Sequence, residues 1–438
     1  MRIVTLVDLR IVIVTYNWPP RNSIGTHRPL AWARHWTAAG AQVTVLTAQK
    51  QPFDRPLDLT FSPIDGLRVV EVSMAGSASL TGFLLKSQLM RVWARKAKKR
   101  FLGRAPVAED PRSSWRSKSK SMAKQLALNA DVVVSTFGPS SAHLIGYDMK
   151  MANPDLFWVA DYRDLWPHYP AASLTHQTDR RATRVHRDTV GIKADLVTAV
   201  SAHMVEQLRI FFNQQTVELP NGFDLDEEEI LQTLSTKPTK RNGPMRIVYT
   251  GPIYEGTQDP RPLLQALADL HKNGGFAKGQ ATVDFYGSRV DLARRLAKNP
   301  IYSPFIRLMG HVSRDDALEA QRAAGLLLLL ESSEPEARGV LTGKVFEYMV
   351  TGRPILCVGS RPEYEIGQLL RATGTGQVFG PDEKHLLESV LLNTLGGEGL
   401  FQAHSANIGE ILKYSRKKQS EWFLGVLIKK LESRSKRK

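Results

Sequence analysis

The 438-residue sequence has a single cysteine, Cys357, and therefore no internal disulfide, which fits a reducing compartment. No stretch approaches the ~20 apolar residues that a membrane-spanning helix needs. The opening residues, MRIVTLVDLR, include Asp8 and lack a signal-peptide core and cleavage site, so we expect a cytoplasmic protein. With 42% apolar and 23% charged residues, the composition excludes a wholly disordered chain.

Several motifs of cofactor and hydrolase sites are also missing. The histidines are scattered without the spacing of metal ligands, and the acids at 224–226 fall in a turn and not after a strand. Neither the GxGxxG dinucleotide fingerprint nor a GxSxG nucleophile elbow occurs. We therefore expect no metal or other cofactor.

The net charge is +16, and it is concentrated in one stretch. Residues 86–124 hold 13 Lys/Arg against two acids, a local charge of +11. Within 81–104 the apolar residues fall near one helical stripe: Phe83, Leu85, Leu89, Val92, Trp93 and Phe101. A cationic helix with an apolar face is typical of a helix lying on an anionic membrane. The alternatives are a helix packed on its own domain or a nucleic-acid patch, but no aromatics are interleaved for base stacking, so we expect no nucleic-acid partner.

Runs rich in apolar and β-branched residues alternate with helical patterns along the whole chain. Such runs predict strands buried on both faces, as in parallel sheets. The predicted strands of the first half are 10–15, 41–48, 67–73, 130–137, 156–162 and 194–201, and those of the second half are 245–251, 281–288, 305–310, 325–331 and 354–359. A loop at 16–29 and a helix ending at Gly40 separate the first two strands. The fold class predicted is α/β, with two Rossmann-like doubly wound domains facing a cleft.

The length also favours two domains. Turn signals in ELPNGFD (218–224) and the polar sequence that follows indicate a boundary. We expect a first domain over 1–225, with a basic amphipathic insertion at about 81–124, and a second domain over 226–415. Residues 416–438 are expected to form a helix and a basic tail.

The stretch GVLTGKVFEYMVTGRPIL (339–356) contains the clearest candidate site. It follows a core strand and predicts a helix capped by Thr342, with Gly343 and Lys344 in the first turn, where an anion is favoured. Glu347 is three residues beyond Lys344 on the same face, and a carboxylate suits the vicinal diol of a ribose. The alternative is a simple ion pair between Lys344 and Glu347.

A second, weaker signal is YTGPIYEGTQDPRPLLQAL, in which Gly251 ends a strand and a helix begins near Arg261. A glycine at this point lets the backbone approach a phosphate closely. An ordinary strand-to-helix turn explains the pattern about as well.

In the first half, Asp161, Arg163 and Asp164 follow the strand at 156–162. Acids at a strand end can orient a hydroxyl or act as a base, with an arginine to fix one of them. A structural Asp–Arg network is the alternative.

Two further loops of the first half contain candidates. His143 follows another strand, and a capping or core histidine is the favoured interpretation there. Gly25 and Arg28 lie in the loop NWPPRNSIGTHR, where they either hold substrate or shape the loop.

In these residues and their surrounding segments, the chain resembles the retaining glycosyltransferases of the GT-B fold, family 4, over nearly its whole length. The resemblance rests on VTYNWPPRNSIGTHRPLAWARHW, VADYRDLWP, TAVSAHMVEQL, ELPNGFD, VYTGPIYEG, LMGHVSRDDALEA and, most specifically, GVLTGKVFEYMVTGRPIL. It implies that the domain over 226–415 binds a nucleotide-diphosphate-sugar donor, such as a UDP- or GDP-sugar, without a metal. It also implies that the domain over 1–225 binds the acceptor and that the helix in 416–438 returns to this N-terminal domain.

Residue by residue, the resemblance implies that Glu347 meets the donor ribose and that Gly251, Gly343 and Lys344 contact the diphosphate. His311 and Val312 match the segment that frames the base.

The chain departs from the family pattern at three positions. Gly339 stands where the first Glu of the family's pair is expected, and Pro252 and Gln258 replace an Arg and a Lys of the first loop. Lys344 and Arg261 are the candidates to supply the missing positive charge.

The resemblance further implies transfer of the sugar with retention at the anomeric carbon, with Asp164 and His143 positioning the acceptor together with Gly25, Arg28, Asp161 and Arg163. The basic stretch favours a lipid-linked or polysaccharide acceptor and a location on the inner face of a membrane. The alternatives are a nucleotide-sugar epimerase of the same fold and a non-catalytic protein that binds membrane or nucleic acid through 86–124.

Overall fold

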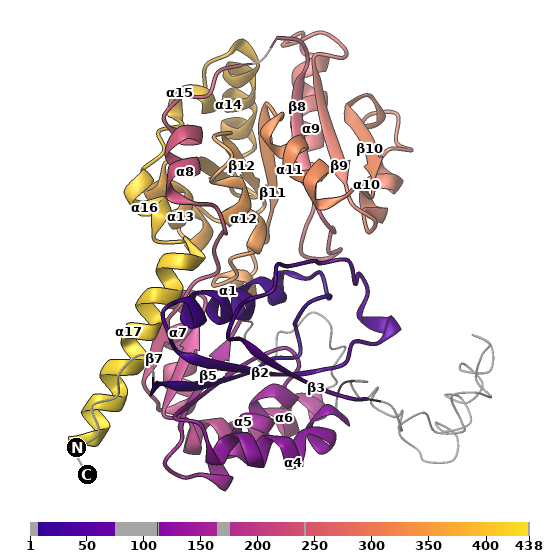
Figure 1. Ribbon diagram of the computed structural model, residues 1–438. Coiled ribbons are helices and arrows are strands. Elements are labelled where there is room, and N and C mark those ends of the chain that lie inside the picture. Colours follow the sequence, from indigo (N-terminus) through magenta and orange to yellow (C-terminus); the bar gives the residue numbers. More distant parts are fainter. Residues whose placement is uncertain (1–7, 75–111, 113, 164–175, 241, 437–438) are drawn as a thin grey trace, which may run out of the picture. The chain divides into compact units, whose positions relative to one another are not determined.

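The computed structural model describes residues 8–74, 112, 114–163, 176–240 and 242–436 of the chain (Figure 1). The chain forms two compact units. Unit 1 comprises Met1–Val200, Met204–Leu219 and Gln419–Lys438, and unit 2 comprises Ser201–His203 and Pro220–Lys418. Most of the predicted basic stretch at 81–124, namely 81–111 and 113, lies outside the described residues.

Unit 1 is built on a seven-stranded sheet in the order β3-β2-β1-β4-β5-β6-β7, in which every pair of neighbours is parallel. The strands are β1 (Arg10–Val14), β2 (Gln42–Ala48), β3 (Arg68–Val72), β4 (Val132–Thr136), β5 (Phe157–Tyr162), β6 (Leu196–Ala199) and β7 (Thr216–Glu218). β4, β5 and β6 are buried along their whole length, as a sheet covered on both faces requires.

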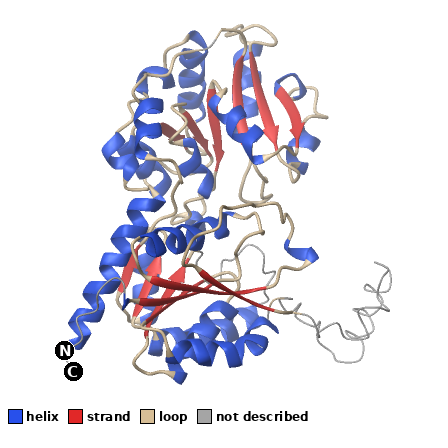
Figure 2. Ribbon diagram, viewed as in Figure 1, coloured by secondary structure: helices blue, strands red, loops and turns tan. Residues whose placement is uncertain are grey.

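Helices cover both faces of this sheet (Figures 1 and 2). In its described residues, the helices of unit 1 are α1 (Ile24–Ala38), α4 (Ser114–Leu128), α5 (Ser141–Ala152), α6 (His176–Lys193), α7 (Ala202–Phe212) and α17 (Arg416–Ser435). Of these, α7 and α17 begin in residues assigned to unit 2. One hydrophobic core joins the sheet to α4, α5, α6 and α7, and the other joins it to α1 and α17.

Unit 2 has a six-stranded parallel sheet in the order β10-β9-β8-β11-β12-β13. Its strands are β8 (Met245–Thr250), β9 (Ala281–Tyr286), β10 (Ile306–Gly310), β11 (Leu326–Leu330), β12 (Ile355–Val358) and β13 (Gly376–Phe379). β11 consists of five leucines, all buried, and forms the middle of the sheet.

The helices of unit 2 again form two layers. They are α8 (Glu227–Leu234), α9 (Arg261–Lys272), α10 (Asp291–Leu296), α11 (Arg314–Arg322), α12 (Gly343–Tyr348), α13 (Glu365–Thr373), α14 (Lys384–Gly396), α15 (Leu400–Ala403) and α16 (Ile408–Leu412). One core contains α9, α10, α14 and α15, and the other contains α8, α11, α12, α13 and α16.

The strand order of each sheet reverses once. In unit 1 the reversal lies between β1 and β4, and in unit 2 it lies between β8 and β11. In open parallel sheets the connections on either side of such a point leave in opposite directions, and ligands bind beyond the carboxyl ends of the strands there. The strand ends at these two points are therefore the candidate ligand-binding positions of the two units.

The α/β class and all eleven predicted strands are confirmed, with ends that differ by a few residues at most. β7 and β13 were not predicted from the sequence. The predicted loop at 16–29 was too long, because α1 begins at Ile24 and contains Pro29. Gly40, with φ +98°, follows the C-cap of α1 as predicted. Among the described residues, no helix combines the length and apolarity needed to cross a membrane.

Candidate functional site

At the reversal point of unit 2, a glycine follows β8. Gly251 has φ +108°, and its N–H donates to the carbonyl of Tyr286 at 2.8 Å. The next loop packs a glycine against it, since a Cβ on Gly287 would lie 2.6 Å from the carbonyl oxygen of Gly251. The positive φ and the close backbone approach both require glycine. The result is a strand end without side chains, next to β11.

Lys344 of α12 reaches this strand end. Its Nζ donates to Oη of Tyr249 at 2.7 Å and lies 4.5 Å from the centroid of that ring. A Cβ on Gly251 would lie 2.8 Å from Cε of Lys344, so the glycine also makes room for the lysine side chain. The structure thus brings together two residues that were predicted as diphosphate contacts.

A buried acid lies near Lys344. Burial raises the pKa of Glu331, directly after β11, to about 7, against the opposing effect of the Lys344 charge. Burial likewise lowers the pKa of Lys344 to about 8, opposed by Glu331 and Glu347. Each of the two residues therefore favours the charged form of the other.

Thr342 occupies the N-cap position of α12, but its side chain makes no capping hydrogen bond. Its Oγ1 donates instead to Oε1 of Glu331 at 3.2 Å, so the predicted capping role was wrong. Gly343 is buried as the first residue of the helix. α12 has six residues, so the lysine charge outweighs the helix dipole as a source of positive potential.

Glu347 pairs with Arg314, the first residue of α11, whose Nη2 lies 3.0 Å from Oε1 of Glu347. The simple ion pair between Lys344 and Glu347 considered from the sequence is not formed, because Lys344 bonds to Tyr249. Glu347 is partly exposed, at 21% of its side chain. Its carboxylate therefore remains accessible to hydroxyl groups.

The segment predicted to frame a base follows β10. His311 is exposed, whereas Val312 is half-buried and packs against the core that contains α12. The segment leads directly into α11, whose first residue is Arg314. The ion pair of Arg314 with Glu347 therefore connects this segment to α12.

Gly339 cannot be replaced by an acid without a shift in its surroundings. A Cβ at this position would lie 3.0 Å from Oγ of Ser201 and 3.1 Å from His203, and Oγ of Ser201 donates to the carbonyl of Gly339 at 2.7 Å. The side-chain position of the first acid of the family's pair is therefore occupied by neighbouring residues of unit 2.

The departure at Gln258 also has a local explanation. Gln258 is buried, and its Oε1 accepts hydrogen bonds from the N–H of Tyr254 at 3.0 Å and Oη of Tyr249 at 3.2 Å, which holds the loop after β8. Arg261 is exposed and pairs with Asp259 at 2.6 Å. Of the two cations considered as replacements, Lys344 is the one that donates to the carbonyl of Pro252, next to Gly251.

In unit 1, Asp161 lies at the end of β5 and is buried. Arg28 binds both of its oxygens, at 2.7 and 3.2 Å, and the hydroxyls of Thr136 and Thr198 donate at 2.8 and 2.7 Å. With four donor contacts inside the protein, this carboxylate is used by the fold. Asp161 is therefore part of a structural Asp–Arg network, as in the alternative left open from the sequence, but its arginine is Arg28 and not the predicted Arg163.

Arg163 and Gly25 lie together near the β1/β4 reversal point. Arg163 donates to the carbonyl of Phe137 from Nε at 3.0 Å and also from Nη2. Its guanidinium occupies the space that a Cβ on Gly25 would need. Asn17, after β1, donates to the carbonyl of Gly138, after β4, at 2.8 Å.

His143 is fully buried in α5. Its Nδ1 lies 2.8 Å from Oγ of Ser135, and its ring lies 4.6 Å from that of Tyr162. Burial, together with His186 and Arg163, lowers its pKa well below the usual value for histidine. It is a core histidine, and a role in positioning the acceptor would require an exposure that it lacks. Asp164 lies outside the described residues.

Three residues of this site were not predicted from the sequence: Tyr249, Arg314 and Glu331. Glu331 could have been found, because it directly follows a run of five leucines and thus a predicted strand end. Arg314 and Tyr249 had no such signal. Over the described ranges, no group of three His, Cys, Asp or Glu side chains is arranged to hold a metal.

No family model matches the sequence, and no curated protein matches it. Solved structures do match. A lipopolysaccharide outer core galactosyltransferase, WaaB, in its apo form is 13% identical with a TM-score of 0.56, and the match covers 96% of this chain and 100% of that one.

Two further matches concern trehalose 6-phosphate. A structure from E. coli described as trehalose-6-phosphate bound with UDP-2-fluoro glucose is 12% identical with a TM-score of 0.60, covering 96% and 99% of the two chains. A trehalose 6-phosphate synthase from Burkholderia multivorans is 9% identical with a TM-score of 0.61, covering 98% and 99%. These likenesses extend along the whole chain and show the fold, which is GT-B.

Proposed function

We propose that this protein is a glycosyltransferase that moves a sugar from a nucleotide-diphosphate-sugar donor to an acceptor hydroxyl. The observation that supports this best is the contact of Lys344 with Gly251 and Tyr249 at the β8/β11 reversal point. A cation beside a side-chain-free strand end suits a diphosphate, which needs close backbone approach and positive charge together. Among the structures of the same fold, one is a galactosyltransferase and one was bound with UDP-2-fluoro glucose.

The proposed reaction breaks the bond between the anomeric carbon and the diphosphate oxygen and forms a bond from that carbon to the acceptor oxygen. The acceptor proton passes to the leaving phosphate, so no separate protein base is needed. The new bond forms on the face that the diphosphate leaves, which retains the anomeric configuration. Lys344 stabilises the negative charge that develops on the diphosphate, and its fixed position means that little reorganisation is required.

Glu347 is proposed to accept hydrogen bonds from the ribose hydroxyls of the donor. Its ion pair with Arg314 fixes the position of the carboxylate, whose two oxygens can accept from two hydroxyls. His311 and Val312, on the segment that leads to Arg314, are proposed to frame the base. Gly343 is proposed to contribute its backbone N–H to the diphosphate.

The acceptor is proposed to bind unit 1, at the carboxyl ends of β1, β4 and β5. Arg28 and Asp161 stabilise the strand ends there, while Arg163 and Gly25 shape the loops. Asp164 remains a candidate for contact with the acceptor hydroxyl. We further propose a lipid-linked or polysaccharide acceptor and peripheral attachment to an anionic membrane, on the basis of the charge of 86–124.

A thermal-shift panel of nucleotides and nucleotide sugars tests the donor class, because a ligand that binds only the folded state raises its Tm. A UDP- or GDP-sugar should raise the Tm of the wild type, and Glu347→Ala should lose most of that shift and the turnover. Glu410→Ala is the matched control, since Glu410 is also an ion-paired glutamate of unit 2, bound to Lys413. If no nucleotide sugar shifts the Tm, or if Glu347→Ala behaves like Glu410→Ala, the proposal fails.

Stereochemistry is tested separately. The product formed from an α-linked donor should show an α-anomeric proton in its NMR spectrum. A β-anomeric product would refute retention without affecting the donor assignment. Conversion of the donor in the absence of any acceptor, without release of free sugar, would indicate an epimerase instead.

A further inference from the structure

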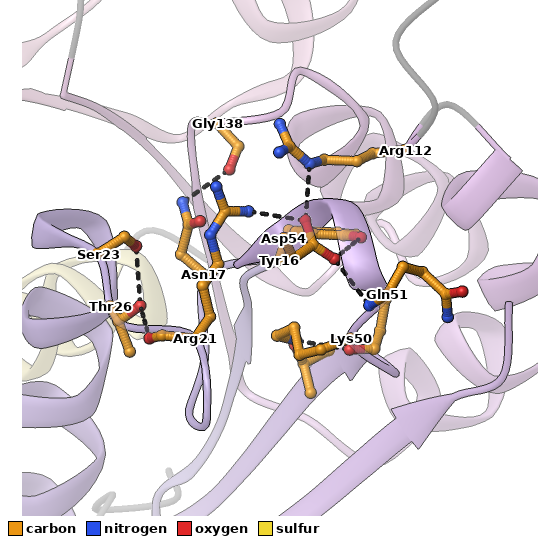
Figure 3. A network of polar contacts seen from close by, with 12 residues as sticks. Tyr16, Asn17, Arg21, Ser23, Thr26, Lys50, Gln51, Asp54, Arg112 and Gly138 are labelled. Carbon is orange, nitrogen blue, oxygen red and sulfur yellow. Dashed lines mark hydrogen bonds and ion pairs between the residues drawn. The ribbon is translucent and has the colours of Figure 1, made fainter. Parts of the chain in front are cut away.

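A second charged cluster lies in unit 1, outside the residues discussed so far (Figure 3). Its centre is Asp54, a buried carboxylate in the 3-10 turn Pro52–Asp54 after β2. Oη of Tyr16 donates to it at 2.8 Å, Arg21 donates at 3.1 Å, and Arg112 donates at 3.3 Å. Figure 3 shows the two guanidinium groups approaching Asp54 from different sides.

Three cations surround the ring of Tyr16. The guanidinium carbons of Arg21 and Arg112 lie 6.0 and 5.3 Å from its centroid, and Nζ of Lys50 lies 5.2 Å from it. Both arginines bind Asp54, and the charge of Asp54 also raises the pKa of Lys50. The charge of Glu71 also raises the pKa of Lys50, although the two side chains are beyond ion-pair distance.

Lys50 is the least compensated member of the cluster. It follows β2, and its Nζ donates to Oγ1 of Thr47 at 3.1 Å and to the carbonyl of Ala48 at 2.5 Å, both neutral acceptors. Burial lowers its pKa to about 8. Among the described residues no carboxylate lies within ion-pair distance of it. An anion bound close to the ammonium group would favour its charged form and offset the free-energy cost of its burial.

The cluster lies where a ligand of unit 1 would bind. Tyr16 follows β1 and Lys50 follows β2, so both lie at the carboxyl edge of the sheet, and Asn17 bridges to the reversal point. The side chains of Arg21 and Arg112 are 18% and 19% exposed, so both reach the surface. Guanidinium groups bind phosphate oxygens in pairs of parallel hydrogen bonds, which makes them well suited to phosphate.

We propose that Arg21, Lys50 and Arg112 form a binding site for a phosphate or diphosphate group, and that this group belongs to the acceptor. The site itself depends only on unit 1. Its assignment to the acceptor rests on the proposed function.

The test is calorimetric titration of the full chain with inorganic pyrophosphate. Because the proposed donor site would also bind pyrophosphate, the titration is made in a Lys344→Met background. This protein should retain one pyrophosphate site. Addition of Lys50→Met should weaken that site at least about tenfold, the usual effect of losing one charge-assisted contact. Lys118→Met, which removes an exposed lysine of α4, is the matched control and should change nothing.

Two measurements separate a ligand site from a polar scaffold. A ligand site predicts that Lys50→Met leaves the Tm of the unliganded protein unchanged or raised, because a desolvated ammonium is removed; a scaffold predicts a lower Tm. Arg21→Lys, which keeps the charge, should bind pyrophosphate better than Arg21→Gln. Absence of pyrophosphate binding in the Lys344→Met protein, or equal binding by the Lys50→Met and Lys118→Met proteins, would overturn the proposal.

Competition identifies the source of the phosphate. A sugar 1-phosphate in solution and an isoprenoid phosphate in detergent micelles are each tested for displacement of pyrophosphate. Displacement by either supports the assignment to the acceptor and names its class, and displacement by neither refutes that assignment. Since the donor test depends on Lys344 and Glu347 in unit 2, it can fail while pyrophosphate binding to unit 1 persists, and the reverse also holds.

Discussion

The guanidinium of Arg314 lies 3.0 Å from Oε1 of Glu347 and joins the start of α11 to α12. Both side chains are partly exposed, at 39% and 21%, so the pair adds little to stability, ~0–1 kcal/mol. Its main effect is to orient the carboxylate proposed to hold the donor ribose.

Arg314→Ala should therefore raise the KM for the nucleotide sugar about three- to tenfold with a smaller change in kcat, because ground-state binding is what is lost. Steady-state kinetics with Arg294→Ala as the control measures this, since Arg294 forms a comparable exposed pair with Asp291. An unchanged KM, or a loss confined to kcat, would contradict the role given to Glu347.

Donor affinity should fall as the pH rises through about 8. Burial lowers the pKa of Lys344 from 10.5 to about 8, so the free protein loses this charge above that pH, while a bound diphosphate favours the charged form. Above the pKa, binding takes up a proton, and the affinity should decrease by up to about tenfold per pH unit. Titrations of the nucleotide sugar at a series of pH values would show it, and Lys344→Met should remove the effect.

Glu331→Gln sharpens this test. The Glu331 charge raises the pKa of Lys344, so its removal should move the decline in affinity to a lower pH. A decline that stays in place in Glu331→Gln would show that another group titrates.

The fold could be predicted from the sequence because the central strands are continuous runs of apolar residues. β11, for example, consists of five leucines, which is typical of a parallel strand buried on both faces. β7, with the sequence TVE and no fully buried residue, is an edge strand of unit 1, and β13 is the edge of unit 2. Such short strands depend on a neighbour for their hydrogen bonds, and no local pattern indicates them.

Site residues could be predicted from the sequence only where they lie at the end of a predicted strand or the start of a predicted helix. Gly251 was predicted from its position at a strand end and Lys344 from its position in the first turn of a helix, and the structure brings them together. The Asp54 cluster was missed because Tyr16, Asp54 and Arg112 are far apart in the sequence and meet only in the folded unit. Thr342 occupies the N-cap position without a capping hydrogen bond, and its hydroxyl instead donates to Glu331, a contact that spacing alone does not reveal.

Restoring the acid at position 339 should harm the protein. In Gly339→Glu the new side chain would meet Ser201 and His203, whose atoms lie only 3.0 to 3.1 Å from the point where its Cβ would stand. Overpacking of this kind typically costs ~1–3 kcal/mol. We expect a lower Tm and no gain in turnover.

A compensating change provides the check. His203→Ala removes part of the obstruction, so the double variant should recover some of the Tm lost in Gly339→Glu. If Gly339→Glu alone keeps the wild-type Tm and increases turnover, the space at this position is larger than the structure indicates.

Phe423 attaches the C-terminal helix α17 to unit 1. Its ring is fully buried and lies 5.6 Å from those of Trp32 and Trp36, and Nε1 of Trp36 donates to the carbonyl of Ser420 at 2.8 Å. Phe423→Ala should cost about 3–5 kcal/mol, since it removes a core aromatic and leaves a cavity between two tryptophans. Trp422→Ala is the matched control, because the neighbouring ring is 48% exposed and its loss should change stability by less than about 1 kcal/mol. Urea unfolding followed by tryptophan fluorescence and circular dichroism compares the two variants. Phe423→Ala removes an aromatic ring from the buried face of α17, and Trp422→Ala removes one from its exposed face. Equal urea midpoints of the two variants would mean that packing of α17 does not contribute to the stability of unit 1.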